Sequence, residues 1–183
     1  MPMMNWAQLL NSPTSVADGT ALANSVTLTD INPSGAGGSW TVPANFDTNG
    51  SVFELTAWGV FSTTATPTLS LGFYLGGVAG AALLTTGAIT TGTTLTNVPW
   101  WLQAHVVIRA TGATGSAKSR GRCEFGTAVG AINHLPMPAT ADTSTVTIDT
   151  TTAKQFTVGA QWGTANASNT ITCQHFLAVS LGA

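Results

Sequence analysis

The chain has 183 residues, of which 7% are charged and 44% are hydrophobic, and its formal net charge is −2. An ordinary soluble domain carries about 25% charged residues, so the surface here must consist largely of Thr, Ser, Asn and Gly, which are easily desolvated when two such surfaces meet. This balance excludes long-range attraction to nucleic acid or to a membrane surface, and it suits a subunit of an assembly better than a free cytosolic enzyme.

Residues 1–24 lack a sustained periodicity, and we expect them to form an irregular N-terminal arm. The start MPMMNWAQLL has no basic segment followed by an apolar core, so we expect no secretory signal. No run approaches the ~20 apolar residues that a membrane helix needs. We expect residues 25–183 to form a single domain that begins with strands over 25–31 and 39–43.

Strict alternation of apolar and polar residues begins at residue 51. In SVFELTAWGVFST (51–63), Phe53 and Leu55 share one face and Trp58 lies on the other. TLSLGFYLGG (68–77) alternates as well, and the turn TTATP between the two segments predicts a hairpin. A short strand is expected at ALLTT.

The second half of the chain repeats this period. WWLQAHVVIRA (100–110) and SAKSRGRCEF (116–125) alternate on either side of the turn TGATG, which predicts another hairpin. Residues 127–144 predict a long loop, and after a short strand at TVTID the segments 154–163 and 169–182 predict a final hairpin. About eight strands separated by turns and long loops are typical of an antiparallel β-sandwich, and their spacing favours the jelly-roll variant.

No constellation of residues points to catalysis. The acidic residues are scattered, and most lie in predicted turns, where Asp commonly forms the turn. His105, His134 and His175 form no short metal-ligand motif. Cys123 and Cys173 are too far apart for a metal knuckle, and we expect buried free thiols. We therefore expect no enzyme activity, no cofactor and no bound metal.

Four of the five basic residues lie within one short stretch. Lys118, Arg120 and Arg122 occupy alternate positions, so all three project from one side of a strand. Arg109 joins the same face if the turn keeps its register. Nucleic-acid binding would need interleaved aromatic residues and a larger positive charge. Two interpretations stay open: a charged edge that prevents sheets from stacking, and a docking face for an acidic partner surface.

Trp58 and Trp101 lie opposite the core face of their strands. An outward-facing Trp is costly to leave in water and is enriched in interfaces. His175 falls in an apolar row, which favours a core or interface histidine over a metal ligand. We expect Trp58, Trp101 and His175 at a contact between identical subunits. Cover by another loop of the same chain and stacking against a sugar are the alternatives.

Four stretches carry a resemblance to a known family. They are LLNSPTSVADGTALANSVTLTDINP, WTVPANF with GSVFELTAWGVFSTTATPTLSLGFYLGGVAG, TNVPWWLQAHVVIRATG, and TTTAKQFTVGAQWGTANASNTITCQHF. They cover nearly the whole chain, and AWGVFSTTATPTL and VGAQWGTANASNT are the most specific. They resemble small β-rich virion proteins of tailed phages of actinobacteria, described as minor tail or head-decoration proteins. The resemblance implies a trimeric jelly-roll subunit on the particle surface, without enzyme activity or catalytic residues.

The sequence thus predicts a capsid decoration, or cement, protein of a bacteriophage virion, made in the host cytoplasm. A homotrimer would bind the major capsid protein on the outer capsid surface and stabilise the shell, with residues 1–24 reaching along it. Arg109, Lys118, Arg120 and Arg122 would orient this docking. One alternative is a tail-associated module that binds a receptor or a cell-surface glycan. Another is a hydrolytic tail enzyme, which would need converging acids or a nucleophile beside its base.

Overall fold

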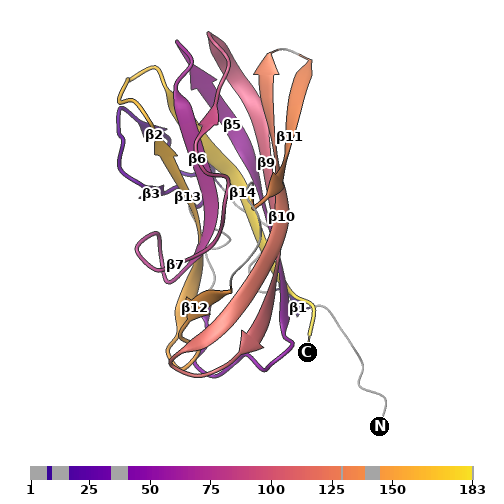
Figure 1. Ribbon diagram of the computed structural model, residues 1–183. Helices are drawn as coiled ribbons and strands as arrows, with labels where there is room; N and C mark the ends of the chain where they lie inside the picture. Colours follow the sequence, from indigo (N-terminus) through magenta and orange to yellow (C-terminus); the bar gives the residue numbers. More distant parts are fainter. Residues whose placement is uncertain (1–7, 10–16, 34–40, 129, 139–144, 183) are drawn as a thin grey trace.

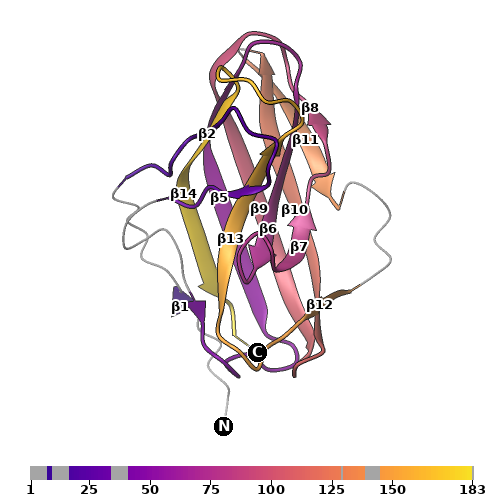
Figure 2. The ribbon, with the colours of Figure 1, turned by 90° about the vertical axis from the view of Figure 1, so that its left-hand side faces the viewer.

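The computed structural model describes residues 8–9, 17–33, 41–128, 130–138 and 145–182. These residues form two antiparallel β-sheets that pack face to face, and none of them is helical (Figure 1 and Figure 2). The predicted all-β antiparallel sandwich is therefore confirmed. In the same described part of the chain, no helix is long and apolar enough to cross a membrane.

The larger sheet has eight strands, in the order β1-β14-β5-β9-β10-β11, and β2 and β12 pair with β14 and β10. Its strands are β1 (Gln8–Leu9), β2 (Leu22–Ala23), β5 (Val52–Thr63), β9 (Leu95–Ala110), β10 (Gly115–Ala128), β11 (Ala131–Met137), β12 (Val146–Ile148) and β14 (Thr170–Ser180).

The smaller sheet has six strands, in the order β3-β13-β6-β7, and β4 and β8 pair with β13 and β6. Its strands are β3 (Thr29–Asp30), β4 (Thr41–Val42), β6 (Thr68–Leu75), β7 (Ala81–Thr85), β8 (Ile89–Thr90) and β13 (Lys154–Trp162). β3 is much shorter than the strand expected over 25–31, because side chains there bond to the local backbone instead: Asn32 N donates to Asp30 Oδ1 at 2.8 Å.

The core lies between the two sheets, because each long strand turns its apolar residues inward. Aromatic pairs join the two layers. The ring centroids of Phe53 (β5) and Phe156 (β13) lie 5.2 Å apart, and those of Phe73 (β6) and Phe176 (β14) lie 5.9 Å apart. Burial of such side chains, at about 25 cal/mol per Å² of apolar surface, is the main favourable contribution to folding.

Two of the predicted hairpins are wrong, and for the same reason. β5 and β6 lie in different sheets, as do β13 and β14, so the turn after each first strand crosses from one layer to the other. β5 pairs with β14 and β6 pairs with β13, so two strand pairs wrap together across both sheets, as in a jelly roll. Strands that face each other across a core show the same alternation as strands that lie side by side, so alternation alone cannot separate the two arrangements.

The hairpin of β9 and β10 is confirmed, and Gly112 in its turn has a φ of +110°, which favours glycine. The loop expected over 127–144 is wrong in part, because β11 pairs with β10 there. β11 is an edge strand with mostly exposed side chains. An edge position tolerates Pro136, whose missing N–H would interrupt a central strand.

A β-bulge in β14 changes the face on which its later residues lie. The register with β5 shifts between Cys173 and His175, so Cys173 and Phe176 are both buried while His175 lies on the outer face. The interpretation that placed His175 in one apolar row with Cys173 is therefore wrong.

The described part of the expected N-terminal arm lies along β14. β1 pairs with the last residues of β14, and β2 pairs with Thr170 and Ile171 at its start. Leu22 is buried in the core, and its carbonyl oxygen accepts a hydrogen bond from the indole N–H of Trp162 at 3.3 Å. The rest of residues 1–24 lies outside the described residues, so the reach of the arm and its boundary stay predictions.

Candidate functional site

A row of three aromatic side chains crosses the outer face of the eight-stranded sheet. Trp101 of β9 pairs with Trp58 of β5, and Trp58 pairs with His175 of β14. The ring centroids of Trp58 and Trp101 lie 4.9 Å apart with planes inclined by 11°, and those of Trp58 and His175 lie 4.0 Å apart with planes inclined by 25°. We call these three side chains the aromatic ladder. The structure thus brings together the three residues expected at a subunit contact, and that role stays a prediction.

Stacking and burial fix the position of the ladder. A stacked aromatic pair contributes about 0.5–1.5 kcal/mol beyond the burial of its area, and Trp58 has a stacked ring on each side. Burial lowers the pKa of His175, so its imidazole is neutral at pH 7. Trp101 remains 38% exposed, because only one of its neighbours in the row is aromatic.

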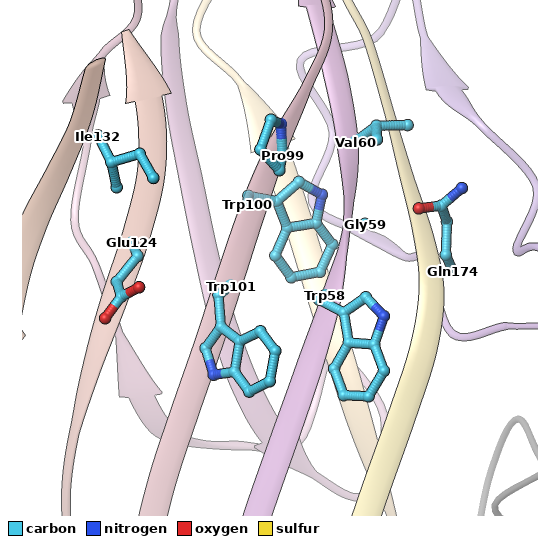
Figure 3. A pocket seen from close by; sticks show the side chains of 9 residues that line it. All are labelled: Trp58, Gly59, Val60, Pro99, Trp100, Trp101, Glu124, Ile132 and Gln174. Atoms are coloured by element: carbon cyan, nitrogen blue, oxygen red, sulfur yellow. The ribbon is translucent and has the colours of Figure 1, made fainter. Parts of the chain in front are cut away.

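A hollow of about 270 Å³ lies beside the ladder (Figure 3). It is lined by Trp58, Gly59, Val60, Pro99, Trp100, Trp101, Glu124, Ile132 and Gln174. Figure 3 shows Glu124 on one side of the two indole rings and Gln174 on the other, so the polar side chains lie at the two ends of a mostly apolar surface. Gly59 lets β5 approach β14 closely here, because a Cβ at this position would overlap the backbone of Thr172.

Neighbouring side chains orient both polar groups of the hollow. Oε1 of Glu124 lies 3.4 Å from Nδ1 of His134 on β11 and 3.7 Å from Nε of Arg122. Nε2 of Gln174 donates a hydrogen bond to Oδ2 of Asp18 at 3.3 Å. The carboxylate and the amide therefore each have a partner side chain at their end of the hollow.

Three basic residues follow one another on the outer face of β10. We call Lys118, Arg120 and Arg122 the basic column. Their partners in β9 are outward-facing positions, so the column lies on the same sheet face as the ladder. Arg109 is exposed on β9, and the register between β9 and β10 shifts across from it. Six of the seven residues expected at contacts therefore lie on one face of the larger sheet, and Arg109 has no paired position on β10 at the register shift. The partners of all seven stay unassigned.

The two ends of this face differ. Lys118 pairs with Val107, which pairs with Val52 at the start of β5. The last residues of β14 lie at the same end, because Ser180 pairs with Phe53, and β1 pairs with them. We call this the basic end. The hollow lies toward the opposite end, where β11 pairs with β10; Figure 1 shows β1 at the lower end and β11 at the upper end.

Elsewhere, acidic and thiol groups serve the fold. Hydrogen bonds from Thr151 and Thr152 lower the pKa of Asp149. Cys123 and Cys173 are free and buried as expected, and burial raises the pKa of the Cys123 thiol to about 12. Among the described residues, no three His, Cys, Asp or Glu side chains converge as metal ligands would. The absence of enzyme activity stays a prediction.

The sequence identifies the two indoles of the ladder and the basic column, but it places His175 in the wrong row and misses the hollow. The indoles and the cations are visible because each lies opposite the core face of its own strand. Glu124, Ile132 and Gln174 come from three different strands, and nothing in the sequence shows that these strands bring them to one place. Only the strand order reveals it.

Comparison with known proteins gives distant similarities in fold. No family model and no curated protein matches the sequence. The chain is similar to the CBM2 module of the evolved Dit of Lactobacillus casei BL23 phage J-1, with 13% identity and a TM-score of 0.33 over 79% of this chain and 68% of that one. It is similar to the legume lectin-like domain from Entamoeba histolytica, with 10% identity and a TM-score of 0.30 over 93% and 95%.

A chain of the infectious bursal disease virus Gx strain is also similar, with 14% identity and a TM-score of 0.30 over 96% of this chain and 31% of that one. The similarities thus relate this sandwich to a phage module and to a viral protein. At such TM-scores they carry no argument about function.

Proposed function

We propose that the protein is a structural protein of a phage virion, and specifically a decoration protein that binds the outer capsid surface as a trimer and stabilises the shell. The observation that carries the proposal is the difference between the two ends of the outer face of the larger sheet. The column begins with Lys118 at the same end as β1, the strand formed by the expected arm. A capsid-facing end needs both features: cations that orient docking and a segment that reaches along the shell. The sequence resemblance to small virion proteins supports the same role.

In this proposal the basic end meets the major capsid protein. Lys118 and Arg120 speed the encounter with an acidic patch more than they strengthen the final complex. Three such ends in one trimer bind together, so contacts that are weak alone give a high overall affinity. A trimer that bridges neighbouring capsomers stabilises the shell, because it binds the assembled state and not its separated parts.

Neutralising the basic end tests the proposal. A Lys118→Gln/Arg120→Gln variant should associate with empty shells about three to ten times more slowly at low salt, and the difference should shrink as salt rises. Kinetics on immobilised shells would measure this. Lys154→Gln is compared with the single variant Lys118→Gln, because each removes one lysine charge near this end of the sandwich but Lys154 lies on the other sheet, 3.8 Å from Asp149. Only Lys118→Gln should slow association if the outer face of the larger sheet is the docking surface. Equal association rates for the double variant and the unmodified protein would contradict docking through the basic end.

A further inference from the structure

We propose that the hollow beside the aromatic ladder binds a neutral saccharide. The apolar face of a pyranose ring would lie against Trp101, and the hydroxyl groups of the sugar would form hydrogen bonds with Glu124 and Gln174. This site is separate from the basic end, and its occupation does not depend on capsid docking.

The wall of the site is an indole held in place before binding. Trp101 is 38% exposed and stacks on Trp58, whose other side is covered by His175. A pyranose ring has an apolar face of C–H groups, and a rigid aromatic surface is its natural partner. Because stacking within the ladder already orders Trp101, little side-chain entropy is lost on binding.

The polar groups of the hollow suit the rim of a sugar ring. Ligand sites are mostly apolar, with a few placed polar groups that fix orientation. Here the carboxylate of Glu124 accepts hydrogen bonds from hydroxyl groups, and His134 and Arg122 orient it at 3.4 and 3.7 Å. The amide of Gln174, bonded to Asp18, provides a second oriented group at the other end.

The charge of the lining selects among saccharides. Glu124 is the one charged residue among those that line the hollow. An acidic sugar would bring its carboxylate toward Glu124, and like charges repel, although Arg122 at 3.7 Å offsets part of this repulsion. We therefore assign the site to neutral sugars. β10 and β14 are three strand spacings apart, or about 14 Å, so the hollow accommodates more than one linked ring.

A second copy of the chain is the competing occupant, and the same polar groups disfavour it. A second copy that covered the hollow would place Glu124 under a protein surface, where a carboxylate loses its hydration. A saccharide instead replaces that water with hydroxyl groups. The position agrees as well, because Lys118 and Glu124 are six residues apart on β10, or about 20 Å, so a subunit docked by its basic end keeps the hollow accessible.

Titration calorimetry and tryptophan fluorescence with soluble oligosaccharides test the site. The probes are the neutral tetramers cellotetraose, maltotetraose and chitotetraose, with tetragalacturonate as the acidic comparison. We expect at least one neutral tetramer to bind, Trp101→Ala to weaken it by about tenfold or more, and Glu124→Gln to weaken it by about fivefold. Phe46→Ala is the matched control and should bind unchanged, because Phe46 is 39% exposed in the loop before β5, at the basic end.

Three results would overturn the proposal: no binding of any neutral tetramer, preference for the acidic tetramer, or equal binding by Trp101→Ala. Light scattering on the same variants measures the mass of the assembly and so tests whether the ladder is a subunit contact. If Trp101→Ala alters the assembly mass while saccharide binding is unchanged, the ladder is a subunit contact and the saccharide site is wrong. Capsid association measured in parallel stays normal for Trp101→Ala if the two sites are separate, so failure of this site is distinguishable from failure of the docking function.

Discussion

Both sheets carry aromatic side chains on their outer faces, and the two faces hold them differently. On the six-stranded sheet, Tyr74 is only 7% exposed, and burial raises the pKa of its hydroxyl. Gly72 and Gly159 pair with each other beside its ring. A Cβ at Gly159 would lie 2.7 Å from the Tyr74 ring and 3.0 Å from Val78. The ring therefore occupies space that the two glycines leave free.

On the eight-stranded sheet, the described residues cover Trp101 less completely than Tyr74 is covered. Trp101 stacks on Trp58 at one side and remains 38% exposed. The two rings therefore differ in how they are buried. Tyr74 is packed within the chain, whereas Trp101 keeps exposed surface that another molecule can cover. We therefore place both proposed contacts on the larger sheet.

Truncation of the two rings gives the largest expected contrast. Tyr74→Ala should lower the free energy of unfolding by about 3 kcal/mol, because it leaves a cavity over the glycines. Trp101→Ala should lower it by about 1 kcal/mol, which corresponds to one lost stack on a partly exposed ring. Urea unfolding of both variants measures the difference. Similar losses in the free energy of unfolding would contradict the contrast between the two rings, because Trp101 would then be as tightly packed as Tyr74.

A methyl group placed under the tyrosine should have the next largest effect. Gly159→Ala should cost about 2 kcal/mol, because its Cβ forces the Tyr74 ring and Val78 to move. In the Tyr74→Ala background most of this cost should disappear, since the main obstacle is gone. A double-mutant cycle by urea unfolding tests both statements. Additive losses would show that the glycine serves the backbone and not the ring.

Acidification should loosen the ladder, and only slightly. The pKa of His175 is lowered in the folded state by burial, so its contribution to stability is fully present above the unfolded value of about 6.5 and is lost as pH falls through the lowered folded value. The loss should be about 0.5 kcal/mol or less at this partly exposed site. It should appear as a weaker near-ultraviolet dichroism of the stacked indoles between pH 7.5 and pH 5.

His175→Gln is the control, because it removes the imidazole from the ladder and leaves the other two histidines in place. The dichroism of this variant should not change with pH in that window. If it changes as much as that of the unmodified protein, another group is responsible, and the neutral imidazole does not hold the ladder.

The sequence predicts the strands better than their partners. Phe53 and Leu55 mark the inner face of β5 correctly, and both are buried. The same alternation led to a hairpin of β5 with β6, yet these strands belong to opposite sheets. The β9–β10 hairpin was predictable because a glycine turn joins two alternating segments. β11 was not predictable, because an edge strand with exposed side chains shows no alternation of apolar and polar residues.

The site was predictable only one residue at a time. Trp58 and Trp101 are visible in the sequence because they lie opposite apolar neighbours on their strands. Their contact with His175 was not, because a single unpaired residue in β14 places His175 on the outer face. The hollow depends on five strands meeting in a particular order, and that order is a property of the folded chain.

Because of the bulge, β14 should tolerate a change of residue type better than a change in the number of its residues. Every side chain after Cys173 takes its side of the sheet from that one extra residue, including Phe176 in the core. Conservative replacements along β14 are expected to be absorbed locally. Deleting one residue there would instead exchange interior and exterior for the rest of the strand, so insertions and deletions, more than substitutions, should be the changes that this segment does not tolerate.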